Sequence, residues 1–293
     1  MNYISKELID WSVNKIRKEY PDDVSLLIGH KHWKIEPDGN EVAFNFFIPS
    51  TERGYSLSKT FIIDGIGYDL FPMSWERVEG IANLNEGLTT CLADGVILHA
   101  HSVEEQERFE MLQKRLFDNL SNPEFTYKKG LEKIATSMEL YKNMLFEESF
   151  SHVRKASGYI AGYLSQAIAT VNGTYFRRGP ENQIAILSEM KHLPEQFLSL
   201  YQSIVTAKTL QETKELCYQM INVTRDFFAE WSSRTESETK EFHFEDLAGW
   251  YEEGTYTFRR IYHYCDQKDV FNCFAWGYNF QQEFDSIKEE FGL

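Results

Sequence analysis

Cysteine is scarce in this chain of 293 residues, and the cysteines present form no metal-binding motif. They are Cys91, Cys217, Cys265 and Cys273, and no two of them stand in a CxxC pair. A zinc site is therefore not expected, and reduced thiols packed in the core are the ordinary prediction for such residues.

The sequence also has no long apolar run and no recognisable leader. No apolar stretch approaches the ~20 residues that a membrane-spanning helix needs. The chain opens with MNYISKE, a mixed polar start, in place of a basic segment followed by an apolar one. We therefore expect a cytoplasmic protein with no membrane partner.

Basic residues are too few to balance the acidic ones. Thirty Lys and Arg stand against forty-five Asp and Glu, which gives a formal net charge of −15. This charge repels nucleic acid, so we expect no nucleic-acid partner, whereas cationic small molecules are tolerated. Simple solubility is the plainer explanation of the charge. No Walker loop, Rossmann fingerprint, HExxH or GxSxG motif is present.

The first third of the chain alternates helix, strand and turn signals. Apolar residues recur at helical spacing over residues 3–19, and a short apolar run over 24–28 suits a buried strand. The Pro-Asp-Gly-Asn run at 37–40 predicts a turn, and a strand follows it from Glu41. Residues 60–71 predict a further pair of strands.

Each of these later strand regions carries one acidic residue of interest. Alternation over residues 42–48 predicts one apolar core face and puts Glu41 at the open end of the opposite face. The second region breaks at Asp64-Gly65, and its later half, IGYDLFP, holds Asp69 between apolar neighbours. Such an acid is hydrogen-bonded, paired or functional if it is buried. Glu41 is also explained as a solvated residue after a turn.

Helical patterns dominate the remainder of the chain. Ser74 is the expected N-cap of a helix beginning near Trp75. A turn at Asp94-Gly95 precedes one more short apolar run, and the pattern is helical from Val103 onward. Asn122-Pro123 ends one helix, so we predict domains at residues 1–122 and 123–293. Later helices are expected near 127–148, 150–171, 181–190, 195–206, 210–232, 245–265 and 269–291.

The order of these elements resembles the nucleotidyltransferase superfamily typified by DNA polymerase beta, and within it the lincosamide and aminoglycoside nucleotidyltransferases. The runs FIIDGIGYDLFPMSWERVEGI and GYIAGYLSQAIATVNGTYFRRG have the texture of that family. In the family the first strand ends in Gly-Ser, an Asp-x-Asp follows about twelve residues after the Gly, and a third Asp lies on a later strand. Gly29, Glu41 and Asp69 match those positions, whereas His30 replaces the Ser and Ala43 replaces the second Asp.

The resemblance implies an α+β protein, with an N-terminal nucleotidyltransferase-like mixed sheet flanked by helices and a C-terminal all-helical bundle that binds substrate or partner. It implies transfer of a nucleoside monophosphate from a nucleoside triphosphate to a hydroxyl of a small, cationic, antibiotic-like acceptor, with Mg²⁺ as cofactor. In that role Asp69 is the general base or a metal ligand, Glu41 is the remaining metal ligand, and Gly29 belongs to the phosphate loop.

Further side chains have two explanations each. His30 and Lys31 contact a phosphate or line a polar loop, and Arg53 is a phosphate clamp or an ordinary surface cation. The segment around Gly29 also has the form of a plain β-hairpin, HWKIE-PDGN-EVAFNFF. The pair Glu252-Glu253, in WYEEGTY, belongs to an acidic, aromatic pocket for a cationic substrate or is simply exposed on a helix.

Ala43 bears directly on whether catalysis survives. In-line transfer uses two divalent ions ~3.5–4 Å apart, and a methyl group takes the place of the carboxylate that would bridge them. One Mg²⁺ can still bind through Glu41 and Asp69. Two functions therefore stay open, an active nucleotidyltransferase or an inactive relative that binds a ligand or a protein. Small residues over 156–165 suit either the bundle interior or the seam of a homodimer.

Overall fold

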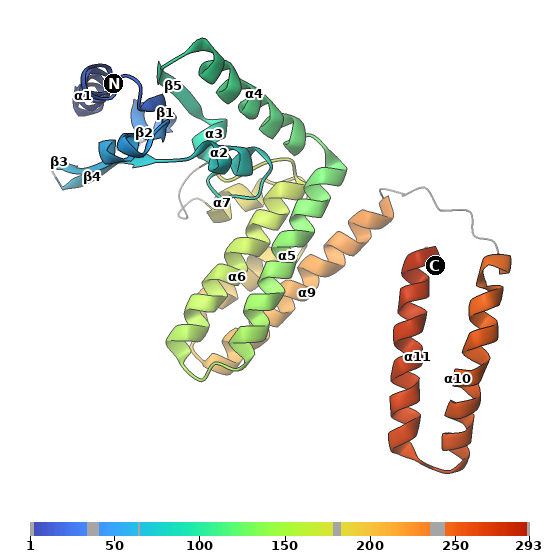
Figure 1. Cartoon of the computed structure of the whole chain (residues 1–293). Coiled ribbons are helices and arrows are strands. Elements are labelled where there is room, and N and C mark those ends of the chain that lie inside the picture. The colour runs from blue at the N-terminus through green and yellow to red at the C-terminus, as the bar shows by residue number, and fades with distance from the viewer. Residues whose placement is uncertain (1–2, 34–40, 64, 178–182, 235–243, 292–293) are drawn as a thin grey trace. The chain divides into compact units, whose positions relative to one another are not determined.

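The chain consists of two compact units in a computed structural model (Figure 1). The first unit is Met1–Glu230 and the second is Trp231–Leu293. The structure describes residues 3–33, 41–63, 65–177, 183–234 and 244–291. The turn predicted at residues 37–40 lies outside the described residues, as does Asp64.

A mixed sheet forms the N-terminal part of the first unit. Its described strands are β1 Val24–Trp33, β2 Glu41–Pro49, β3 Lys59–Ile63, β4 Ile66–Pro72 and β5 Gly95–Ala100. They lie in the order β3-β4-β2-β1-β5. β1 is antiparallel to β2 and to β5, β3 is antiparallel to β4, and β2 runs parallel to β4. With helices beside the sheet and helices after it, the protein is α+β, as predicted.

Apolar side chains fill both faces of this sheet. The helices that accompany it are α1 Tyr3–Glu19, α2 Trp75–Ala82, α3 Thr89–Ala93 and α4 Val103–Leu120. On one face Phe46 belongs to a buried cluster with Val78 of α2 and Phe109 of α4. On the other face Phe47 belongs to a second cluster with Ile16 of α1. Consecutive residues of β2 thus point into two separate cores, because side chains alternate along a strand.

β2 differs from its predicted form in two ways. We expected a single core face, but Phe47, on the face predicted to carry Glu41, is fully buried. The register between β1 and β2 also shifts by one residue at Asn45. Such a bulge interrupts strict alternation, so a period of two does not run unbroken from Ile48 back to Glu41.

Helices α5 to α9 complete the first unit and begin the second. Their bounds are α5 Pro123–Leu145, α6 Phe150–Val171, α7 Gln183–Ser188, α8 Phe197–Thr206 and α9 Leu210–Arg234. Figure 1 shows α5 and α6 side by side, and their close packing agrees with this. The side chain of Asn122 caps α5, so the predicted boundary at Asn122-Pro123 falls inside the first unit, between α4 and α5.

Aromatic packing joins α5 to α9. The ring of Phe228 stacks on Tyr127, with 5.7 Å between centroids. Gly130 makes room for it, because an added Cβ there would lie 2.4 Å from the Phe228 ring. The small-residue stretch of α6 is only partly used in such contacts. Ser165 is buried, whereas a Cβ added at Gly162 would meet nothing within 4 Å.

The second unit is a helical hairpin. A short 3-10 helix, Phe244–Leu247, leads into α10 Ala248–Asp266, and α11 Val270–Phe291 follows. The two helices pack through aromatic rings. The ring centroid of Trp250 in α10 lies 6.1 Å from that of Phe280 and 6.2 Å from that of Phe284 in α11. Helices predicted near 245–265 and 269–291 are confirmed within a few residues at each end.

Candidate functional site

Asp69, the acid inside IGYDLFP, is exposed on β4. Its Oδ1 accepts a hydrogen bond of 3.0 Å from Oγ1 of Thr60, its direct partner across the β3–β4 ladder. Tyr68 and Leu70 on either side are buried, so the predicted alternation is confirmed here. Because the carboxylate is open to solvent, burial gives no reason to assign it a function.

Glu41 begins β2, which lies directly beside β4, so the two acid-bearing strands are neighbours. The parallel ladder pairs Phe46 with Phe71. Counted back along that register, Asp69 is level with residue 44, offset from Glu41 by about 10 Å along the strand at the usual rise per residue. The Glu41 side chain lies outside the described side chains. A metal ion shared by Glu41 and Asp69 therefore stays a prediction.

Gly29, expected in a phosphate loop, is a strand residue, and its role in phosphate binding stays a prediction. β1 and β2 pair antiparallel, as the alternative β-hairpin predicts, and the turn between them lies outside the described residues. Gly29 lies inside β1, paired with Phe44 on one side and with Val96 on the other. His30 follows it in the same two ladders. A strand with neighbours on both sides uses its backbone N–H groups in the sheet, so they are not free to surround a phosphate. Lys31 continues β1, and its side chain lies outside those described.

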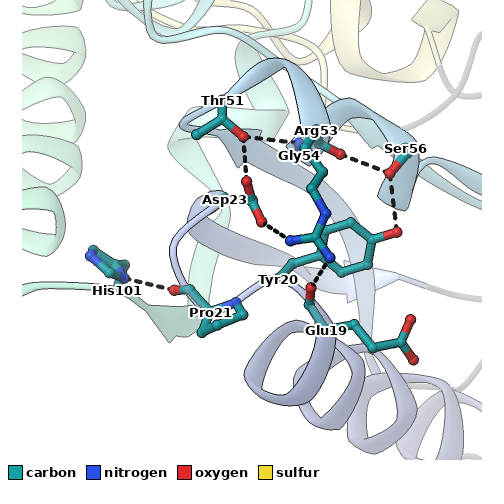
Figure 2. A network of polar contacts seen from close by, with 9 residues as sticks. All are labelled: Glu19, Tyr20, Pro21, Asp23, Thr51, Arg53, Gly54, Ser56 and His101. Carbon is teal, nitrogen blue, oxygen red and sulfur yellow. Dashed lines mark hydrogen bonds and ion pairs between the residues drawn. The ribbon is translucent and has the colours of Figure 1, made fainter.

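Arg53, expected as a phosphate clamp, takes part in a polar network (Figure 2). Its Nη1 donates to Oδ2 of Asp23 at 2.6 Å, and its Nη2 donates to the carbonyl of Glu19 at 2.8 Å. The guanidinium lies 5.1 Å from the ring centroid of Tyr20. Thr51 donates to the second oxygen of the same carboxylate. This network joins the end of α1 to the segment after β2, so Arg53 has a structural task.

Glu252 and Glu253, the predicted contacts of a cationic substrate, lie on α10 in the second unit. Glu252 is exposed, and its carbonyl accepts a hydrogen bond from the hydroxyl of Thr255. The Glu253 side chain lies outside those described. Their role in substrate binding stays a prediction.

A hollow of about 110 Å³ lies in the first unit, beside α5 and α6. Residues from the loop after α2 and from the segment after α6 complete its wall. A drug-sized ligand needs roughly 300–1,000 Å³, so this space suits a small group. Polar side chains that line it are Glu86, Thr89, Lys133, Gln166, Thr170 and Tyr175.

Lys133 supplies an uncompensated charge to this hollow. The side chain is half-buried, and it makes no hydrogen bond or ion pair with any residue that the structure describes. Burial lowers the pKa of the Lys133 ammonium, and the positive charge of Lys129 lowers it further, while Glu132 opposes them. A buried charge is costly unless it is paired, so a bound anion would stabilise this ammonium.

The other charges around the hollow already have partners. Lys129 donates to Oδ1 of Asn85 at 2.6 Å and to Oε2 of Glu132 at 2.7 Å. Glu86 accepts from Nη2 of Arg77 at 2.9 Å, and that hydrogen bond raises the pKa of Arg77. Each carboxylate is thus matched by its own cation, and Lys133 is left over.

Tyr175 forms a second polar edge of the hollow. Its hydroxyl donates to Oδ1 of Asp94 at 3.3 Å and accepts from Nε of Arg177 at 3.1 Å. Burial raises the pKa of the Tyr175 phenol, so the phenol stays protonated at neutral pH. Arg177 also lies 3.9 Å from Asp94.

The described His, Cys, Asp and Glu side chains form no metal site, and the cysteines differ in burial. Within the described ranges, no group of three His, Cys, Asp or Glu side chains is arranged to hold a metal ion. Cys91 and Cys217 are buried, as expected. The same expectation is wrong for Cys265, which is exposed, and for Cys273, which is only partly buried, because both flank the turn of the two-helix hairpin.

The sequence contained one overlooked signal for Lys133. Gly130, Ile134 and Ser137 of α5 are buried, so Lys133 stands directly beside the inward stripe of its helix. Lys129, four residues earlier, is a like charge on the same side, which destabilises a helix. Two lysines so placed need negative charge nearby, which either carboxylates of the protein or a bound anion can supply.

Comparisons with known proteins give one finding about structure. No protein-family model matches the chain, and a search of curated proteins found no match. Among solved structures, the crystal structure of a nucleotidyltransferase-like protein from Exiguobacterium sibiricum 255-15 covers 76% of this chain and 75% of that chain. The two are 14% identical, with a TM-score of 0.39. No helix in the described part of the chain is long and apolar enough to cross a membrane.

Proposed function

We propose that this chain is a ligand-binding protein that holds an anionic group of a small molecule against Lys133. The observation that carries the proposal is an ammonium, half-buried in a hollow, with no partner among the described residues. Of the two functions that the sequence leaves open, this is the non-catalytic one.

The chemistry of the lining narrows the ligand to a phosphate or a carboxylate. The Lys133 ammonium offers charge, and the amide of Gln166 and the hydroxyl of Thr89 offer hydrogen bonds. A charge-assisted hydrogen bond is roughly twice as strong as a neutral one. Because the hollow takes only a small group, the remainder of a larger ligand extends outside it. A cationic ligand is disfavoured there by Lys133 itself.

Nucleotidyl transfer is the second candidate, and one observation favours it. The strands that carry Glu41 and Asp69 are parallel neighbours in the sheet, so the two acids lie on adjacent strands. In this alternative a nucleoside triphosphate and Mg²⁺ bind at Asp69, and a small hydroxyl compound accepts the nucleoside monophosphate. Binding of the nucleotide would then depend on Mg²⁺ and on Asp69, and would not depend on Lys133.

Calorimetric titration separates the two candidates. Inorganic phosphate, citrate and ATP are titrated into the full chain with and without Mg²⁺. We expect metal-independent binding that weakens at least about tenfold in Lys133→Met, since one charge-assisted contact contributes ~1.5–3 kcal/mol. We expect no change in Asp69→Ala.

A matched lysine controls for loss of general positive charge. Lys128 is exposed on the same helix and does not line the hollow, so Lys128→Met is expected to bind as the wild type does. Binding that needs Mg²⁺ and disappears in Asp69→Ala would overturn the proposal and support transfer. Equal weakening in both lysine variants would mean screening of net charge and no site.

A further inference from the structure

Two thiols of the second unit lie next to each other across the turn between α10 and α11. The Sγ atoms of Cys265 and Cys273 are 3.4 Å apart. Cys265 is exposed near the end of α10, and Cys273 is partly buried near the start of α11. A disulfide has an S–S length of ~2.05 Å, so small side-chain rotations close the remaining gap of roughly 1.4 Å.

The turn holds these thiols in position without a covalent bond. Asp269 accepts a hydrogen bond from the backbone N–H of Asn272 at 3.1 Å, and its own N–H donates to the carbonyl of Tyr264 at 2.9 Å. Lys268 adopts a φ of +56°, the left-handed conformation that reverses the chain direction. The two helix ends are therefore fixed relative to each other, and the cost of bringing the sulfurs together is already met.

The remaining cysteines are in the opposite situation. Cys91 and Cys217 are buried in the first unit. Burial raises the pKa of the Cys217 thiol to about 12, so almost no thiolate forms at neutral pH. Reactivity follows thiolate fraction and access. Cys265 and Cys273 are thus the cysteines of this chain that an oxidant reaches.

We propose that Cys265 and Cys273 are a modification site, at which a peroxide forms a reversible disulfide that clamps α10 to α11. The Cys265 thiol loses its proton, and the thiolate attacks one oxygen of hydrogen peroxide. The O–O bond breaks, a sulfenic acid forms, and the leaving hydroxide takes up the released proton to become one water. The sulfur of Cys273 then attacks the sulfur of Cys265. The S–O bond breaks, and the hydroxyl group leaves as a second water with the proton of Cys273. Two thiols are oxidised and one peroxide is reduced to two waters.

The exposure and the hydrogen bonding of the two thiols determine the order of these steps. Cys265 is the more exposed sulfur and meets the oxidant first. The hydrogen bond between the two sulfurs raises the pKa of the Cys273 thiol, and Cys273 also donates to the carbonyl of Ile261 at 3.9 Å. Cys273 is therefore the resolving thiol. Reduction by an external dithiol restores both side chains.

Mass spectrometry of the full chain tests the proposal. The protein is treated with a slight excess of hydrogen peroxide, blocked with N-ethylmaleimide and digested. We expect a cross-linked peptide pair that joins Cys265 to Cys273 and that dithiothreitol separates. Cys91 and Cys217 are expected to remain reduced and to react with N-ethylmaleimide only after the chain is unfolded. Amide exchange at the end of α10 is expected to slow about fivefold or more, since a cross-link suppresses local opening.

Two variants keep the assignment falsifiable. In Cys273→Ser no disulfide is expected, and the sulfenic acid of Cys265 is expected to be oxidised further to the sulfinic acid. Cys265→Ser is expected to leave Cys273 mostly unoxidised. A wild-type chain whose Cys265 is converted directly to sulfinic acid, or that forms disulfide-linked dimers on a non-reducing gel in place of the internal bond, would overturn the proposal.

Discussion

Arg53 and Lys133 are two cations of the first unit in opposite surroundings. Arg53 is largely exposed, with a side-chain exposure of 63%, yet it has an ion pair, a hydrogen bond to a carbonyl and an aromatic ring. Lys133 is half-buried and has no partner among the described residues. Arg53, which water can solvate, makes several polar contacts, whereas Lys133, which water reaches poorly, makes none with the described residues. The first arrangement serves the fold, and the second is what a binding site requires.

A substitution at Gly54, which packs against the backbone of Asp23 in the Arg53 network, is expected to have the largest effect on stability. A Cβ added at Gly54 would lie 2.2 Å from the carbonyl oxygen of Asp23 and 3.0 Å from Pro49. Because backbone must move to relieve this clash, Gly54→Ala is expected to lower the free energy of unfolding by about 3 kcal/mol. Chemical denaturation followed by circular dichroism measures the loss.

A second glycine provides the control for Gly54. A Cβ added at Gly162 in α6 would meet nothing within 4 Å, and alanine is a better helix former than glycine by ~1 kcal/mol. Gly162→Ala is therefore expected to be neutral or stabilising. If Gly54→Ala were as stable as Gly162→Ala, the tight packing around Asp23 would be refuted.

Replacing each cation by methionine sharpens the comparison at a smaller scale. Arg53→Met leaves Asp23, whose side chain is only 12% exposed, with one partner fewer. We expect a loss of about 1 kcal/mol in the free energy of unfolding, since exposed arginine pairs contribute little more. Lys133→Met is expected to cause no loss, because it removes a charge that has no partner. A clear loss in Lys133→Met with none in Arg53→Met would reverse the roles assigned here.

The dependence of stability on pH is expected to show the smallest effect. The pKa of Lys133 in the folded chain lies below its ordinary value of 10.5, so the unfolded chain binds more protons in the alkaline window between the two. Stability therefore rises with pH in that window. The advantage of Lys133→Met over the wild type is expected in full below the window and to shrink as the pH approaches 10.5. Thermal unfolding at a series of pH values measures it, and an advantage independent of pH would contradict the assignment.

Local patterns predicted most of the elements of this fold. The helix over residues 3–19 and the helix over 150–171 have the predicted bounds. The expected cap is present as well, because Oγ of Ser74 accepts a hydrogen bond from the backbone N–H of Arg77. Periodicity and capping depend on neighbours in sequence, so they are legible before any tertiary contact is known.

Pairing between strands was less accessible to prediction. Gly29 has the spacing of a loop glycine, yet it is a strand residue, because β1 gains partners on both sides. The bulge at Asn45 and the burial of Phe47 depend on α1 returning over the sheet. The hollow could not be predicted from local sequence patterns either. Lys133, Glu86 and Tyr175 are distant in sequence, and they line one hollow only because α5 and α6 pack beside the loop that follows α2.

The state of the Lys133 amine tests the central claim most directly. Reductive methylation with ¹³C-formaldehyde labels every lysine, and the resonance that is missing in Lys133→Arg identifies this one. We predict that its methyl signal titrates at lower pH than those of the exposed lysines, and that inorganic phosphate or ATP shifts it without Mg²⁺. A Lys133 signal that titrates with the other lysines and stays unmoved by both anions would contradict the account.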